Sequence, residues 1–127
     1  MTIDEFFEGW EESRQIYDVL YSLVSSLGLV EVRVTKSQVA FRWRKAFAWA
    51  WIPGKYLRGK IAPLVLSLSL PRWDTSPRWK EIVEPAPGRF MHHLELYSTE
   101  DIDDEVRHWL LEARTYAELG SSDSKSM

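Results

Sequence analysis

The chain has 127 residues, 45% of them hydrophobic, and its net charge is −3, which suits one globular domain with one core. The absence of cysteine excludes disulfide bonds, thiolate metal sites and cysteine nucleophiles. No apolar run is long enough to span a bilayer, and the first residues are too acidic for a secretory signal, so we expect a cytoplasmic protein without membrane contact. Seven tryptophans are many for this length, which indicates an aromatic core or an aromatic binding surface.

The charges are distributed unevenly along the chain. Residues 1–29 hold one basic and six acidic side chains, residues 30–93 hold twelve and four, and residues 94–127 hold three and nine. The net charges of the three parts are therefore −5, +8 and −6. Either the acidic ends attract the basic middle within the fold or in a dimer, or the middle presents a cationic face to an anionic ligand.

Two amphipathic helices are predicted at the ends of the chain. Thr2 and Glu5 have capping-box spacing, and apolar residues recur every three or four positions from Glu11 until Gly28 ends that helix. A second apolar stripe follows Ser98, with acidic residues in its first turns, where the helix dipole favours them. We expect one domain over residues 1–118 and a flexible polar tail over residues 119–127.

The stretch from Val30 to Ile52 predicts three strands separated by tight turns. Alternate residues of a strand share a face of the sheet. One register contains valine, phenylalanine and tryptophan, which we assign to the core. The other register contains alanines and three arginines, namely Arg33, Arg42 and Arg44.

A fourth strand at residues 64–70 and a fifth at residues 89–97 complete the predicted sheet. The connection at residues 71–88 is long, and Ser76-Pro77 predicts one helical turn within it. We therefore expect an α+β fold with an N-terminal helix, a five-stranded, mainly antiparallel sheet and a C-terminal helix. Both helices are expected on one face of the sheet.

Three segments of the chain resemble a known family. They are TKSQVAFRWRKAFAWAW, APLVLSLSLPRWDTSPRWKEIVEPAPGRFMHHLEL and DIDDEVRHWLLEA. Together they resemble the bacterial family called domain of unknown function 5655, from about Phe6 to about Ala117. More loosely, the order of helix, sheet and helix is similar to YdhG-like small α+β domains. The resemblance implies a fold unit and no assigned catalytic residue.

An acid–base enzyme is one alternative. Ser67, His93, Glu95 and Arg42 are expected on one face of the sheet, where they would supply a base, an orienting carboxylate and an oxyanion partner. The sequence has no nucleophile elbow, phosphate-binding loop or dinucleotide motif. His93 and Glu95 could also reach one metal ion, but a third ligand is missing, and we expect neither a metal nor another cofactor.

A nucleic-acid-binding protein is a second alternative, because basic side chains such as Lys36 lie close to aromatic residues in the middle of the chain. The acidic ends of the chain reduce this expectation.

Our leading hypothesis is a non-catalytic binding or protein-interaction module that uses a basic and aromatic sheet face. Its partner would be a small anionic ligand or a protein, and a homodimer is compatible with the sequence. Trp73 and Trp79, in the long connection, are candidates for a pocket wall or a dimer contact. The candidate ligand-binding residues are Arg33, Lys36, Arg42, Arg44, Ser67, His93, Glu95, Trp73 and Trp79.

Overall fold

A six-stranded sheet forms the centre of the structure, a computed structural model that describes residues 1–126 and the side chains of residues 1–119. The strands run in the order β1-β2-β3-β4-β6-β5, and every neighbouring pair is antiparallel. The predicted α+β class and antiparallel sheet are confirmed, but the prediction of five strands is wrong because the sheet has six. The strands are β1 (Glu31–Val34), β2 (Val39–Trp43), β3 (Lys45–Trp51), β4 (Leu64–Leu70), β5 (Trp79–Ala86) and β6 (Arg89–Leu96).

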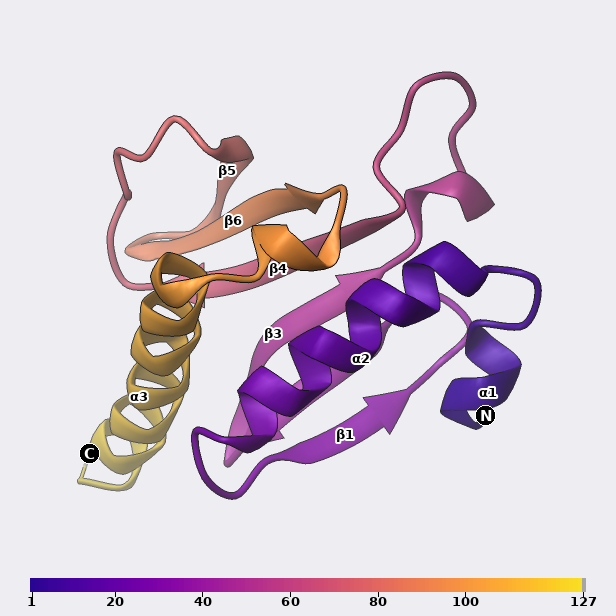
Figure 1. Cartoon of the computed structure of the whole chain (residues 1–127). Coiled ribbons are helices and arrows are strands. Elements are labelled where there is room, and N and C mark those ends of the chain that lie inside the picture. Colours follow the sequence, from indigo (N-terminus) through magenta and orange to yellow (C-terminus); the bar gives the residue numbers. More distant parts are fainter. Residues whose placement is uncertain (127) are drawn as a thin grey trace.

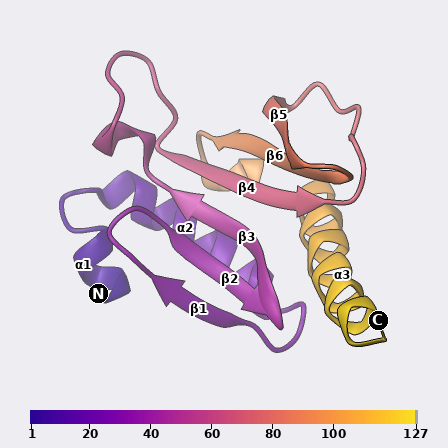
Figure 2. The ribbon, with the colours of Figure 1, turned by 180° about the vertical axis from the view of Figure 1, so that it is seen from behind.

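The long helices lie on one side of the sheet, as Figure 1 shows, and Figure 2 shows the strands from the other side. Helix α3 packs on β2, β3 and β4, and α2 packs on β4. We call the sheet surface opposite these helices the open face. The helices are α1 (Ile3–Phe6), α2 (Glu11–Ser25) and α3 (Asp104–Ser126), with short 3-10 helices η1 (Pro53–Lys55) and η2 (Thr99–Asp101).

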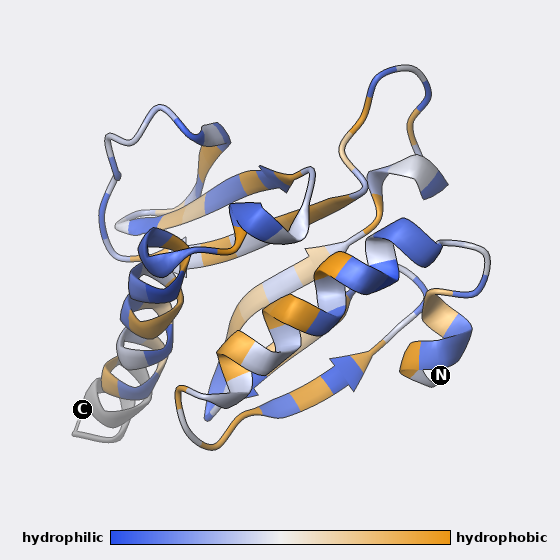
Figure 3. Ribbon diagram, in the orientation of Figure 1, coloured by the Kyte–Doolittle hydropathy of each residue, from blue (hydrophilic) through white to orange (hydrophobic). Residues whose placement is uncertain are grey.

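Capping side chains set the beginnings of α1, η2 and α3. Thr2 and Glu5 form the predicted capping box at α1. Ser98 caps η2, so α3 begins later than predicted, after Asp103, whose carboxylate accepts the Val106 N–H at 3.1 Å. Figure 3 shows hydrophobic bands along α2, and the buried residues of this helix are Ser13, Ile16, Tyr17, Leu20 and Val24. The predicted tail, residues 119–127, falls almost entirely on residues whose side chains lie outside the described part, so it stays a prediction.

A β-bulge in β3 reverses part of the predicted pattern. Phe41 pairs with Ala48 and Arg42 pairs with Ala46, so Phe47 is an extra residue in the ladder. Because a bulge turns two successive side chains to the same side, Phe47 and Ala48 both face the core. After the bulge the two registers are exchanged relative to our prediction.

The tryptophans of β3 therefore lie on the open face and its alanines in the core. Ala48 and Ala50 are fully buried beneath the helices, opposite Leu68 and Leu66 of β4. Trp49, with Trp51 beside it, points the other way and is only partly buried. The small alanine side chains let α3 approach the sheet closely, which is the physical reason that the larger rings are excluded from that side.

The long connection also differs from the prediction. Residues 79–86 form the edge strand β5, which pairs with β6, and Ser76-Pro77 begins no helix. The edge position explains why this polar segment, with Pro85 in it, can be a strand, since an edge strand leaves one row of backbone groups unpaired.

Candidate functional site

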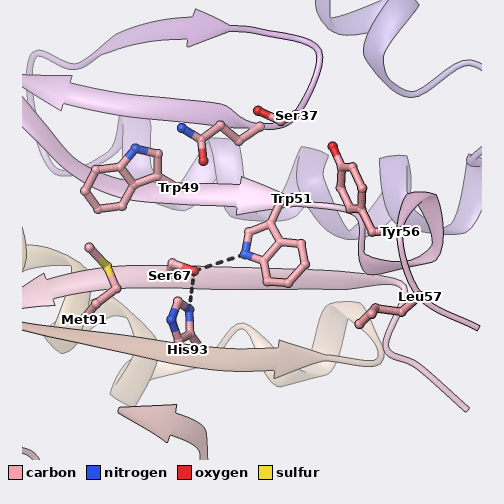
Figure 4. Close-up of a pocket in the computed structure, with 9 residues that line it drawn as sticks. Ser37, Trp49, Trp51, Tyr56, Leu57, Ser67, Met91 and His93 are labelled. Carbon is pink, nitrogen blue, oxygen red and sulfur yellow. Dashed lines mark hydrogen bonds between the residues drawn. The ribbon is translucent and has the colours of Figure 1, made fainter. Parts of the chain in front are cut away.

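The open face contains a hollow of about 620 Å³, which we call the central hollow. Its floor comes from β3, β4 and β6, and its rim from the β1–β2 turn and the loop after η1 (Figure 4). The walls are mostly aromatic and apolar, with a few polar groups among them. The lining residues are Ser37, Gln38, Trp49, Trp51, Tyr56, Leu57, Ser67, Met91 and His93.

A hydrogen-bonded chain crosses three strands on the floor of this hollow. The Trp51 Nε1–H donates to Ser67 Oγ at 3.1 Å, and Ser67 Oγ lies 2.7 Å from His93 Nδ1. Burial lowers the pKa of His93, so its ring is neutral at pH 7. Ser67 Oγ accepts the Trp51 N–H, and its own hydroxyl hydrogen then donates to His93 Nδ1. The neutral His93 ring therefore has its proton on Nε2, where it can donate to a ligand.

A second hollow of about 420 Å³ adjoins the central one, since both are lined by Trp51, Leu57 and His93. It mixes charges: its walls include two lysines and two glutamates, Lys60, Lys80, Glu81 and Glu95. We call it the mixed-charge end.

A third hollow of about 250 Å³ adjoins the central one at Trp49. It is lined by Lys45 and Arg89 and by no acidic side chain, and we call it the basic end. Arg42 is the cross-strand partner of Ala46, which also lines this hollow. We call the three hollows together the groove: the mixed-charge end meets the central hollow at Trp51, and the basic end meets it at Trp49.

Several predicted site residues lie outside this groove. Arg33 and Arg42 are on β1 and β2 of the open face, and Lys36 is in the turn between these strands. Arg44 was predicted within a strand, but it forms the β2–β3 turn with a φ of 66°, and its guanidinium lies 5.6 Å from the Trp43 ring centroid. None of these four basic residues lines the three hollows.

The two tryptophans of the long connection do not form a pocket wall with the groove. Trp79 packs in the helix-side layer, with its ring 4.1 Å from that of Trp109, and its Nε1–H donates to Asp74 at 2.8 Å. Trp73 is 56% exposed and lies edge-on to Phe90.

His92 is fully buried beside this cluster, and its ring lies 4.8 Å from that of Trp79. Its Nε2 accepts the Asp74 N–H at 3.0 Å, and its Nδ1–H donates to the Phe90 carbonyl at 3.1 Å. Both ring nitrogens are thus used in the neutral form, and burial lowers the pKa of His92. This histidine fixes the connection to the sheet and does not reach the groove.

None of the ion pairs of the described residues includes a residue that lines the groove. Each of them involves Arg14, Arg72 or Arg78. Their acidic partners lie in or beside the helices and in the long connection: Asp4, Asp18, Asp74, Asp103, Glu105 and Glu112. Glu95 belongs to none of these ion pairs of the described residues and stands opposite Val65 of β4.

The geometry brings together only part of the predicted acid–base set. Ser67 and His93 are hydrogen bonded, Glu95 lies at the mixed-charge end, and Arg42 stays outside the groove. Among the described residues, no group of three or more histidine, aspartate or glutamate side chains could hold a metal ion. The helices in that part of the chain include none long and apolar enough to cross a membrane.

The sequence interpretation missed the aromatic part of the site. Trp49 and Trp51 were assigned to the core, and Met91 was not singled out. The alternation of tryptophan with alanine in β3 indicates that the two kinds of residue lie on opposite faces, but it does not tell which face the helices cover.

Helices on one face of an antiparallel sheet and an aromatic groove on the other define an α+β domain with an open sheet face. The model of the family described as Domain of unknown function (DUF5655) matches residues 3–116, so the chain belongs to this family. The resemblance of the sequence segments is thereby confirmed, and the looser similarity to YdhG-like domains stays a prediction. No curated protein and no solved structure matches the chain.

Proposed function

We propose that this domain is a non-catalytic binding module that holds its ligand or partner in the groove of the open face. The observation that carries the proposal is the position of Trp49 and Trp51, which lie partly exposed in the middle of the uncovered sheet surface. Rings of this size stabilise a fold most when they are fully buried. Placing them on the open face with alanines behind them favours contact with another molecule.

The size and chemistry of the groove support this proposal. Ligand sites are usually hollows of about 300–1,000 Å³ with mostly apolar walls and a few polar groups that orient the ligand. The central hollow has a volume of about 620 Å³, and the Ser67 hydroxyl, which accepts the Trp51 N–H, is hydrogen bonded to His93 Nδ1. The hydrogen bond from Ser67 thereby fixes the orientation of the His93 ring, which lines the hollow.

The same contacts favour binding over catalysis. Ser67 lies in the middle of β4 and is 4% exposed, so its hydroxyl is poorly placed to attack a substrate. The 2.7 Å contact between Ser67 and His93 has the spacing of a nucleophile and its base, but among the described residues no third group is hydrogen bonded to the other ring nitrogen of His93, and the Ser67 hydroxyl also accepts the Trp51 N–H. The bacterial origin and the cytoplasmic location predicted from the sequence belong to this proposal too.

Nuclear magnetic resonance with a defined probe set tests the proposal. The probes are mononucleotides, short oligosaccharides, aromatic amino acids and short peptides, each added to ¹⁵N-labelled protein. We expect at least one class to shift the indole N–H signals of Trp49 and Trp51 while the signal of exposed Trp73 stays unchanged. If no probe shifts the groove signals, the proposal is wrong. Conversion of a probe during the experiment would favour the enzyme alternative.

A further inference from the structure

The spacing of the two groove tryptophans suits two successive flat groups. Trp49 and Trp51 are two positions apart on one strand, so their backbone positions are about 6.6 Å apart at roughly 3.3 Å per residue. Figure 4, which looks onto the open face, shows both indole rings broadside. Nucleic-acid bases stack on such rings, and successive bases of a single strand can use successive rings.

The charge at one end of the groove suits phosphate. The basic end is lined by Lys45 and Arg89, and Arg42 stands opposite its Ala46. No acidic side chain lines this hollow, and none of the three cations belongs to an ion pair of the described residues. Lys45 is steadied by the Tyr116 ring, with its Nζ 5.4 Å from the ring centroid.

The opposite end has a different character. Lys60 and Lys80 are offset there by Glu81 and Glu95, which would repel phosphate and accept hydrogen bonds from base or sugar groups. The groove therefore has one end for the backbone, an aromatic middle for bases and a mixed-charge end.

The charge around the basic end is positive in the strands. Helix α3 reaches this end through Tyr116, and no acidic side chain in the described part of α3 lines it. Residues 30–62, which form β1 to β3 and the following loop, carry eight basic side chains and one acidic side chain.

We propose that the groove binds single-stranded nucleic acid, with two successive bases on Trp49 and Trp51 and backbone phosphates at the basic end. This inference rests on the proposed function, because it names the ligand of the same groove. A strand is favoured over a free nucleotide because the groove offers two rings and, beyond Trp49, a separate basic end. A neutral sugar carries no negative charge that the lysine and arginine of the basic end could bind.

Fluorescence anisotropy with labelled (dT)₁₂ and (rU)₁₂ tests this inference. We expect binding in 50 mM salt and affinity roughly 20-fold lower in 200 mM salt, if three phosphates are contacted, as expected for a single strand. Trp49→Ala and Trp51→Ala should each weaken binding by roughly 5- to 150-fold. The phenylalanine substitutions at both positions keep a ring and should retain most of the affinity.

Matched variants separate the groove from the rest of the surface. Trp73→Ala removes an exposed tryptophan outside the groove, and Arg107→Ala removes an exposed cation from α3, so both should bind as the unchanged protein does. Arg89→Ala should reduce the slope of log affinity against log salt by about 0.7. Equal loss in the groove variants and these controls would overturn the inference.

The competing outcomes are distinguishable. No binding of either oligonucleotide in 50 mM salt overturns the nucleic-acid inference. If the magnetic-resonance probes still shift the groove signals, the binding module itself stands with another ligand. If thymidine monophosphate competes as well as (dT)₁₂ at equal concentration, the ligand is a free nucleotide and the single-strand inference is wrong.

Discussion

Replacing Ser67 with alanine tests the hydrogen-bonded chain that holds the groove together. The hydroxyl links Trp51 of β3 to His93 of β6, and Ser67 is only 4% exposed. Each of the two hydrogen bonds contributes about 1 kcal/mol net, and their loss leaves two polar ring atoms without their partner. We therefore expect Ser67→Ala to lower the free energy of unfolding by about 2 kcal/mol.

Ser69 provides the matched control. It lies two residues further along the same strand and face, is 7% exposed, and makes no side-chain hydrogen bond among the described residues. Ser69→Ala should change the stability by less than about 0.5 kcal/mol.

Thermal unfolding followed by circular dichroism measures the difference between the two variants. For a chain of this length, 1 kcal/mol corresponds to a shift in Tm of roughly 3–5 °C. We expect Ser67→Ala to melt roughly 6–10 °C lower than the unchanged protein. Equal melting temperatures for Ser67→Ala and Ser69→Ala would refute the idea that this chain of hydrogen bonds stabilises the site.

Two further predictions concern the helix-side layer and the histidines. Trp109 is 5% exposed, so Trp109→Ala should lower the free energy of unfolding in urea by about 3–5 kcal/mol. Trp73 is exposed, so Trp73→Ala should lower it by less than about 1 kcal/mol. Similar losses for the two variants would contradict the placement of Trp109 in the helix-side layer. Burial lowers the pKa of His92 and His93 in the folded state below the ordinary histidine value of 6.5. Below a pH of about 6.5 the unfolded chain therefore binds more protons than the folded chain. The free energy of unfolding is therefore expected to fall as the pH drops below about 6.5 and to level off below the folded-state pKa values. An unchanged urea midpoint between pH 7.5 and pH 5.5 would contradict the idea that both histidines are buried in the neutral form.

The sequence predicted β3 as a strand but could not assign its faces. Both registers of β3 are apolar, with Ala48 and Ala50 in one and Trp49 and Trp51 in the other. The choice depends on how closely α3 approaches the sheet, which is a tertiary property. The bulge at Phe47 has no local signal such as a glycine, so the exchange of registers was hidden as well.

The missed strand β5 has a different cause. Its residues are mostly polar and exposed, and Pro85 lies within it, so intrinsic preference favours a loop. Pairing with β6 outweighs that preference. By contrast, leucine at every second position of β4 predicted its strand correctly, and all seven of its residues are buried.

The strand order has a consequence for folding. β1 to β3 pair with their neighbours in sequence, and β5 and β6 form a local hairpin, whereas β4 and β6 join residues 20 to 32 positions apart. Because distant pairings close larger loops, we expect the β4–β6 seam to be the slow step in assembly of the sheet. The contact between Ser67 and His93 crosses this seam, so the groove is completed only when the two halves of the sheet meet. A ligand that binds the completed groove would therefore stabilise the contact between these two halves.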